Sequence, residues 1–256
     1  MSMPFIVHSH IPKTGGSALN RRFLFNRFGE DGVYPLYRYV FERASRLPRR
    51  HVARAMRSFA AAGHVPFGFF DEVYPDAVYI SVFREPVSRF VSFLNFVLSN
   101  PKHAMRERLP AALFENAADN PDALIAAVLS EPRLTVVHSN AQTRLASGAP
   151  RLGDMAVTGD HLRAAFRNLG QARYLTGVQE DLPDLLVRLH AEFPMTAQSI
   201  PMQKSSANLE KRLPRTFRLA DLTPRSLDRI AAANDLDRRL YASVIGQPGA
   251  QASRAA

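Results

Sequence analysis

Residues 4–28 decide the fold, and they read PFIVHSHIPKTGGSALNRRFLFNRF. The run 4–9 is short, apolar and rich in β-branched residues, which is typical of a buried strand. The polar segment 10–17 contains two adjacent glycines, and apolar residues recur at helical spacing over 18–28. This stretch therefore predicts a strand, a tight loop and a helix, in that order.

The same order of elements occurs twice more along the chain. Residues 77–83 are typical of a buried strand, and Pro86 begins an amphipathic helix that extends to about Ser99. A third strand, at 174–178, leads into a helix at 181–193. Strands that alternate with helices indicate a parallel sheet with helices on both faces. We expect an α/β, three-layer, P-loop-like fold with a central parallel β-sheet.

The remaining segments predict less regular structure. An amphipathic helix is expected over 49–62, ending at Gly63. Its apolar face comprises Val52, Ala55, Met56 and Phe59. Residues 101–121 have the composition of an irregular, lid-like insertion, and 138–148 of a polar, mobile segment. A single terminal helix is expected over 223–245.

Length and composition indicate how many domains the chain forms and whether it crosses a membrane. The 256 residues fit one hydrophobic core, so we expect a single domain over 1–246 and a disordered tail over 247–256. No run approaches the roughly 18 consecutive apolar residues of a membrane-spanning helix, and the first residues do not resemble a secretory signal. We therefore expect a cytoplasmic protein without a membrane span.

The charged residues narrow the class of partner. The formal net charge is +10, with 33 lysines and arginines, and lysine occupies only positions 13, 102, 204 and 211. Arginine favours forked contacts to phosphate, sulfate and carboxylate groups. Nucleic acid, an anionic polysaccharide and a multiply charged nucleotide all fit this surplus. The absence of cysteine excludes disulfides, thiolate metal sites and cysteine nucleophiles.

The loop after the first predicted strand has the residues of a phosphate cradle. Gly15 and Gly16 let the backbone approach an anion, Lys13 supplies a positive charge, and the hydroxyls of Thr14 and Ser17 can donate hydrogen bonds. The lysine precedes the glycine pair, whereas in the nucleoside-triphosphate P-loop it follows the second glycine. This departure argues against a triphosphate-hydrolysing enzyme.

A second constellation follows the strand at 77–83. Arg84 stands at the end of that strand, where a Mg²⁺-holding aspartate would be expected in such an enzyme. Ser88 and Ser92 share one face of the predicted helix, with Arg89 beside them. Two anion sites at adjacent strand ends suit a ligand that carries phosphates at both ends.

Together these motifs resemble those of a known enzyme family. HIPKTGGSAL at 10–19 and VFREPVSRFVSFL at 82–94 are similar to the paired signatures of sulfotransferases that use 3′-phosphoadenosine 5′-phosphosulfate (PAPS). The resemblance is greatest to the branch that includes heparan sulfate 2-O-sulfotransferases. GHVPFG at 63–68 and TGVQED at 176–181 also agree with that branch. The matches follow one another in order from residue 5 to about residue 190.

The resemblance implies an enzyme that moves a sulfuryl group from PAPS to a hydroxyl of an acceptor, a carbohydrate or glycoconjugate. The residues that it assigns to the 5′-phosphosulfate are Lys13, Thr14, Gly15, Gly16, Ser17 and Ala18. Arg84 and Ser92 are assigned to the 3′-phosphate, with Arg89 in support. A late loop containing Lys204 and Ser205 is expected over the nucleotide, although the Asn-x-Ser of many relatives is missing there.

The resemblance also implies the catalytic groups. Lys13 is expected at the leaving phosphate, and His64 matches the general base of the 2-O-sulfotransferase branch. Asp71 and Glu72 are alternative bases in a nearby turn. The other histidines have no metal-ligand spacing, so we expect no catalytic metal. His10 could contact the nucleotide.

Two other functions stay open at this point. A non-catalytic basic module could bind an anionic glycan or a nucleic acid with the same arginines, but it would not need two phosphate loops. A P-loop kinase would need Mg²⁺ and a differently placed lysine. We expect no nucleic-acid partner, and the sequence leaves the acceptor and the oligomeric state open.

Overall fold

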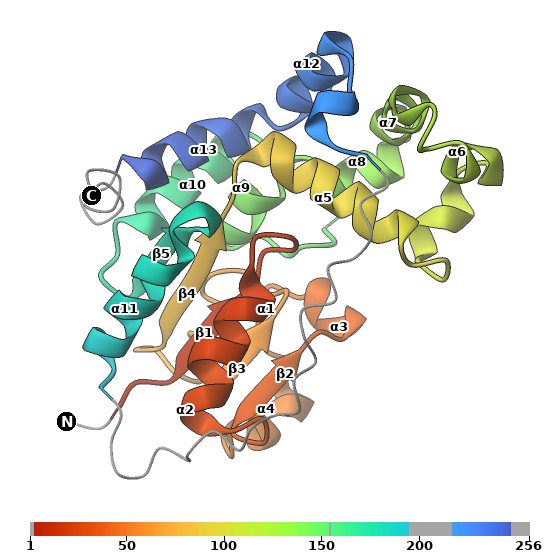
Figure 1. Ribbon diagram of the computed structural model, residues 1–256. Helices are drawn as coiled ribbons and strands as arrows, with labels where there is room; N and C mark the ends of the chain where they lie inside the picture. Colours follow the sequence, from red (N-terminus) through yellow and green to blue (C-terminus); the bar gives the residue numbers. More distant parts are fainter. Residues whose placement is uncertain (1–2, 154, 195–216, 247–256) are drawn as a thin grey trace.

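The computed structural model describes residues 3–153, 155–194 and 217–246, and Figure 1 shows their arrangement. Five strands form one parallel sheet in the order β2-β3-β1-β4-β5. The strands are β1 Ile6–Ser9, β2 Val33–Leu36, β3 Ala60–Gly63, β4 Val78–Phe83 and β5 Tyr174–Val178. The predicted α/β fold with a central parallel sheet flanked by helices is confirmed.

Each face of the sheet is covered by its own set of helices, because successive strand residues point to opposite faces. Val7 of β1 lies in one buried cluster with Leu240, and Ile6 lies in another with Phe23 and Leu186. The first face carries α3 Tyr39–Glu42, α4 Arg49–Ala55, α9 Ala141–Ala146, α10 Gly159–Leu169 and α13 Asp235–Ile245. The second face, in front in Figure 1, carries α1 Gly16–Leu19, η1 Asn20–Phe25, α2 Asn26–Phe28 and α11 Leu182–Glu192.

A third buried cluster lies among helices beyond the sheet, at the upper right of Figure 1. These elements are α5 Pro86–Leu98, η2 Ala104–Arg108, α6 Ala111–Glu115, α7 Pro121–Ser130, α8 Pro132–His138 and α12 Pro224–Ala233. Met105 and Phe114, from the predicted irregular insertion at 101–121, are buried in this cluster. The insertion therefore contains two short helices, η2 and α6, that pack into this cluster, contrary to the prediction of an irregular or lid-like insertion.

Between β1 and β4 the connections between strands run towards opposite edges of the sheet. From β1 the chain passes to β2 and β3 on one side, whereas β4 lies on the other side of β1 and leads to β5. In open α/β sheets, ligands bind at the carboxyl ends of strands at such a switch point. The Lys13–Ser17 loop follows β1 and Arg84 follows β4, so both predicted anion loops lie there.

Residues 49–62 depart from the prediction of one helix. The helix α4 ends at Ala55, and Ala60–Gly63 forms the strand β3 between β1 and β2. Met56 and Phe59, expected on a buried face, are each 60% exposed. A Cβ at Gly63 would lie 2.4 Å from the Leu36 backbone, so the strands approach too closely for larger side chains.

Other boundaries also differ from the sequence expectations. The predicted terminal helix divides into α12 and α13 at Asn234, whose side chain is buried and bonds Ile230 O at 3.0 Å. The segment expected to be polar and mobile contains α9, all of whose residues are buried. The helix at 18–28 is present, but its middle is the π-helix η1. Among the described residues, no helix is long and apolar enough to cross a membrane.

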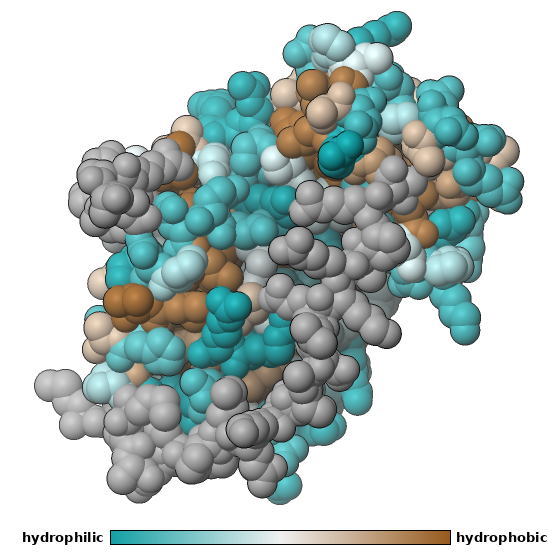
Figure 2. All heavy atoms as spheres, viewed as in Figure 1, coloured by the Kyte–Doolittle hydropathy of each residue, from teal (hydrophilic) through white to brown (hydrophobic). Residues whose placement is uncertain are grey.

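Figure 2 shows a patch of apolar residues on the surface over α11, where Val187 is 68% exposed. Arg188 of the same helix donates to Thr176 O of the edge strand β5 at 2.8 Å. This patch lies on the second face of the sheet, on a different element from either predicted anion loop.

Candidate functional site

The loop after β1 is held in an unusual backbone conformation. Lys13 has φ 70° and Gly15 has φ 91°, so both occupy the left-handed region. That region costs a non-glycine residue about 1 kcal/mol, and such strain is concentrated at functional positions. Thr14 is buried and its hydroxyl donates to Ile11 O at 2.9 Å. In this structure its proton therefore stabilises the loop, and the contact of Thr14 with a phosphate stays a prediction.

The helix that follows this loop begins with free backbone donors. No side chain caps α1 at Gly15, and Ser17 is exposed while Ala18 is half-buried. A Cβ on Gly16 would lie 2.1 Å from His10 Cδ2, so only glycine fits there. Uncapped N–H groups at a helix start are natural ligands for an anion.

Lys13 and Arg84 are neighbours across the switch point. Arg84 Nη1 donates to the backbone oxygen of Lys13 at 3.1 Å, and Lys13 Nζ lies 4.7 Å from the centre of the Phe96 ring. Partial burial lowers the pKa of Lys13, and the charge of Arg84 lowers it further. Two cations held this close make the carboxyl ends of β1 and β4 a strong site for an anion.

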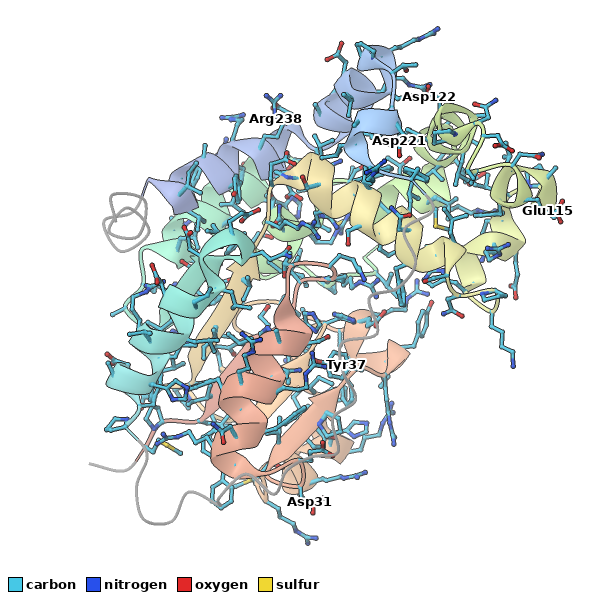
Figure 3. The ribbon with its side chains drawn as sticks, in the orientation of Figure 1. Asp31, Tyr37, Glu115, Asp122, Asp221 and Arg238 are labelled. Carbon is cyan, nitrogen blue, oxygen red and sulfur yellow. The ribbon has the colours of Figure 1, made fainter. Side chains whose placement is uncertain are left out.

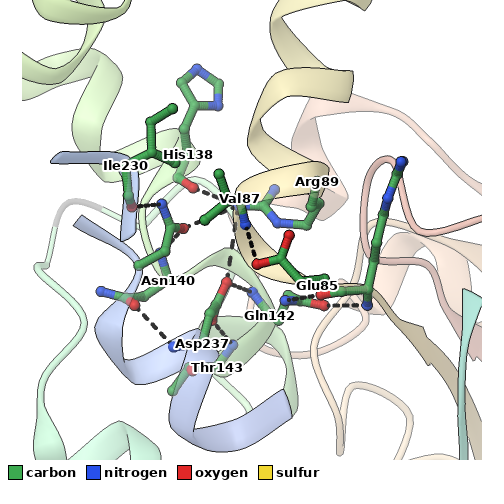
Figure 4. Close-up of polar contacts among 11 residues, drawn as sticks. Glu85, Val87, Arg89, His138, Asn140, Gln142, Thr143, Ile230 and Asp237 are labelled. Atoms are coloured by element: carbon green, nitrogen blue, oxygen red, sulfur yellow. Dashed lines mark hydrogen bonds and ion pairs between the residues drawn. The ribbon is translucent and has the colours of Figure 1, made fainter. Parts of the chain in front are cut away.

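The backbone of Arg84 is fixed by the side chain of Gln142 in α9. Arg84 N donates to Gln142 Oε1 at 2.9 Å, and Gln142 Nε2 donates to Arg84 O at 2.9 Å. Asp237 accepts in turn from the backbone N–H groups of Gln142 and Thr143, at 3.1 and 2.7 Å (Figure 4). Contacts from α9 and α13 thus fix the position of the Arg84 backbone.

The start of α5 is already capped. The carboxylate of Glu85 accepts from Val87 N at 2.9 Å and from Ser88 N at 2.6 Å. These first N–H groups are therefore engaged, and an anion beside α5 must be bound by side chains. Arg84 and the half-buried Ser92 are the predicted ones.

Arg89 lies inside the protein, on the other side of α5 from solvent. Its side chain is 1% exposed, and its Nη2 donates to His138 O at 2.6 Å. The same nitrogen lies 3.4 Å from Asn234 Oδ1 and 3.9 Å from Asp237 Oδ2 (Figure 4). The contacts of Arg89 therefore join α5 to α8 and α13 inside the protein, and the charge of Arg84 is near enough to contribute to lowering the pKa of Arg89.

His64 directly follows β3 and has the tautomer that a general base needs. Its Nδ1–H donates to the backbone oxygen of His10 at 2.7 Å, so Nε2 carries no proton and can accept one. Burial lowers the pKa of His64 to about 3, with Arg151 as a second cause. At neutral pH the imidazole is uncharged.

Beside His64 lies a polar network that the sequence reasoning did not assemble. Tyr37, labelled in Figure 3, follows β2, and its hydroxyl contacts Asn20 and His10. The His64 ring centre lies 5.1 Å from that of Tyr37 and 4.9 Å from that of His10. His8 in β1 and His10 just after it are two positions apart, and their rings stack with centres 5.0 Å apart, so this spacing was the available signal for the cluster.

Arg151 was also missed. It pairs with Glu42 at 2.5 Å, both side chains being nearly buried, and its charge lowers the pKa of His64 and of His10. The loop that carries Arg151 has no motif, so its position depends on the fold alone. It adds positive charge beside the candidate base.

The two alternative bases are engaged elsewhere. Asp71 forms a forked pair with Arg173, with both bonds at 2.7 Å. Glu72 pairs with Arg46 on the surface at 2.5 Å. Lys204 and Ser205 lie outside the described residues. Within the described ranges, no group of three or more histidine, aspartate or glutamate side chains could hold a metal ion.

No protein-family model matches this chain, and no curated protein matches it.

Proposed function

We propose that this chain is a PAPS-dependent sulfotransferase that transfers a sulfuryl group to an acceptor hydroxyl, on a carbohydrate or glycoconjugate. We further propose that its fold is a P-loop-like variant. The observation that carries the proposal is the hydrogen bond from Arg84 to Lys13 O, which joins two cationic strand-end loops at the switch point of the sheet. A ligand with an anion at each end matches such a paired site.

The two loops have different chemistry, and we assign them to the two ends of the nucleotide. The Lys13–Ser17 loop, with the uncapped start of α1 and Ala18, would hold the 5′-phosphosulfate. Arg84 and Ser92 would hold the 3′-phosphate, because the N–H groups of α5 are capped by Glu85. Gln142 and Arg89 support this second end from the interior.

The reaction requires an in-line displacement at sulfur. A bond forms between the acceptor oxygen and sulfur as the bond between sulfur and the bridging phosphate oxygen breaks. Nε2 of His64 accepts the acceptor's proton. Lys13 stabilises the negative charge that the departing phosphate oxygen gains with the bonding electron pair.

The low pKa of His64 is consistent with this role. In the free protein the imidazole is uncharged because of burial and the positive charge of Arg151. A bound donor brings negative charge that offsets Arg151, so the pKa of His64 rises when the site is filled. The base is thus unprotonated before binding and becomes stronger when the donor is present.

The test is calorimetric titration with 3′-phosphoadenosine 5′-phosphate (PAP), the product of the donor. The wild type is expected to bind PAP at micromolar concentration and ATP much more weakly, and Arg84→Ala is expected to lose PAP binding. Arg163→Ala, which removes an exposed arginine paired with Asp160, is the matched control. Failure of the wild type to bind PAP would exclude the sulfotransferase proposal.

A further inference from the structure

A chain of hydrogen bonds leads from the buried His8 through the buried Asn20 and the partly exposed Tyr37 to His10. His8 Nδ1 lies 2.5 Å from Asn20 Oδ1, and Asn20 Nδ2 lies 2.7 Å from the Tyr37 hydroxyl. That hydroxyl lies 3.1 Å from His10 Nδ1. The contacts join β1, η1 and the residue after β2, and the rings of Tyr37 and His10 lie beside that of His64.

The direction of each bond follows from the groups involved. An amide oxygen only accepts, so His8 donates to Asn20, and the Asn20 NH₂ group then donates to the Tyr37 oxygen. Among the described residues, the Tyr37 proton has one acceptor, Nδ1 of His10. Burial lowers the pKa of His10 well below its ordinary value, so the ring carries a single proton. With Nδ1 accepting, this proton is on Nε2.

The Nε2 edge of His10 faces the phosphate loop. A Cβ built on Gly16 would lie 2.4 Å from His10 Nε2 and 2.1 Å from Cδ2, so this edge packs directly against the first residue of α1. The hydrogen bond that the His10 ring makes to a described residue is at Nδ1, to the Tyr37 hydroxyl. On its other side the ring faces His64, with centres 4.9 Å apart.

We propose that His10 is a second catalytic residue, which donates a hydrogen bond from Nε2 to a sulfuryl oxygen of the donor held by the Lys13–Ser17 loop. Asn20 and Tyr37 are positioning residues that fix its tautomer. His10 keeps its proton throughout, so the displacement at sulfur and the proton transfer to His64 are unchanged. This inference rests on the proposed function and names one further group in the same site.

The first measurement is the tautomer of His10, by long-range ¹H–¹⁵N correlation spectra of protein labelled in its histidine rings. The signals of His10 are assigned by their loss in His10→Gln. The wild type is expected to show a neutral ring protonated at Nε2. Tyr37→Phe, which removes the donor to Nδ1, is expected to give a mixture of both tautomers. A wild-type ring protonated at Nδ1 would overturn the proposal.

The second measurement compares PAPS with PAP, which lacks the sulfuryl group, by calorimetry. His10→Asn removes the donor at the Nε2 position and is expected to weaken PAPS binding about tenfold, with PAP binding unchanged. His10→Gln, whose amide nitrogen can occupy the Nε2 position, should keep most of the affinity for PAPS. His190→Asn, in α11, is the matched control.

The outcomes separate this inference from the proposed function. If the wild type binds neither nucleotide, the proposed function fails, and the role of His10 fails with it. If the wild type binds both and His10→Asn does so equally well, only the role of His10 is refuted. Equal weakening of PAPS and PAP by His10→Asn would also refute it, because that result indicates a purely structural contact with the loop.

Discussion

The guanidinium of Arg84 donates from Nη1 to the backbone oxygen of Lys13 at 3.1 Å, between residues 71 positions apart in the chain. One side chain thereby connects the loop after β4 to the loop after β1. A forked group is suited to this task because it can brace a carbonyl and still offer N–H donors to an anion. Arg84 is in this account the central residue of the nucleotide site.

Replacing Arg84 by lysine keeps the charge and removes the fork. We expect Arg84→Lys to bind PAP at least about tenfold more weakly than the wild type, because one ammonium group cannot serve both the Lys13 carbonyl and a phosphate. Calorimetric titration measures the change, with Arg163→Lys as the control for an exposed arginine. Wild-type affinity in Arg84→Lys would mean that charge alone matters at this position.

Gly16 is predicted to tolerate no side chain. In Gly16→Ala the new Cβ would lie 2.1 Å from His10 Cδ2, so the ring or the loop must move, at a cost of about 1–3 kcal/mol. Gly159→Ala is the matched control, since its Cβ would come no nearer than 3.6 Å to Arg163 Nη1. Urea denaturation and PAP titration are the measurements. If the two variants lose equal stability, the contact between His10 and the loop is not as tight as described.

Acid is predicted to destabilise the fold through its buried histidines. Burial lowers the pKa of His8 to about 4 and that of His64 to about 3, against an ordinary value of 6.5. Below pH 6.5 the unfolded chain takes up protons that the folded protein does not, so the free energy of unfolding falls as pH falls. This contribution is complete above pH 6.5 and is lost progressively towards pH 3–4.

The comparison with a non-titrating variant isolates the contribution of His64. Each histidine that only the unfolded chain protonates contributes a slope of about 1.4 kcal/mol per pH unit. Between pH 6 and pH 4, the free energy of unfolding of His64→Gln should therefore fall less steeply than that of the wild type, by about 1.4 kcal/mol per pH unit. Denaturant titrations at each pH measure this slope. Parallel curves for the two proteins would show that His64 is not held uncharged.

The ion pair beneath α5 is predicted to matter for stability. Asp237 and Arg89 are both almost completely buried, and Asp237 also accepts from two N–H groups of α9. Asp237→Asn leaves the Arg89 charge buried without its partner, and we expect a loss of about 3–5 kcal/mol. Asp160→Asn, which breaks an exposed pair, should cost under about 1 kcal/mol. Similar losses in both variants by urea denaturation would contradict the assignment.

Several elements could be predicted because their sequence signals are local. The strands β1, β4 and β5 are apolar runs that end at polar loops, and α5 begins at a proline that fits the first helical turn. The meeting of Lys13 with Arg84 also follows from sequence, since parallel neighbouring strands end at one edge.

The two strands that were not predicted lack such signals. Pro35 lies within β2, although proline has no backbone N–H to donate. It is tolerated there because β2 is an edge strand and pairs only with β3. Residues 60–63 read Ala-Ala-Ala-Gly, which favours a helix locally. Tertiary context overrides this preference, because β3 is hydrogen-bonded to β1 on one side and to β2 on the other, and at Gly63 the Leu36 backbone leaves no room for a Cβ.

The motifs predicted some residues of the candidate site, but not the residues that contact or lie beside them. Lys13, His64 and Arg84 stand in recognisable segments, whereas Tyr37 and Arg151 come from stretches without a motif. Their positions depend on how β2 and the loop after α9 fold back towards β3. A single sequence carries no spacing rule for such long-range approaches.

The most direct test of the account titrates three adenosine nucleotides, PAP, adenosine 5′-phosphate and adenosine 3′-phosphate, into the wild type, Lys13→Ala and Ser92→Ala. The account predicts that Lys13→Ala weakens only the two ligands with a 5′-phosphate, and that Ser92→Ala weakens only the two with a 3′-phosphate. If both variants weaken all three ligands equally, or if the wild type binds none of them, the paired anion site at the ends of β1 and β4 does not exist as described.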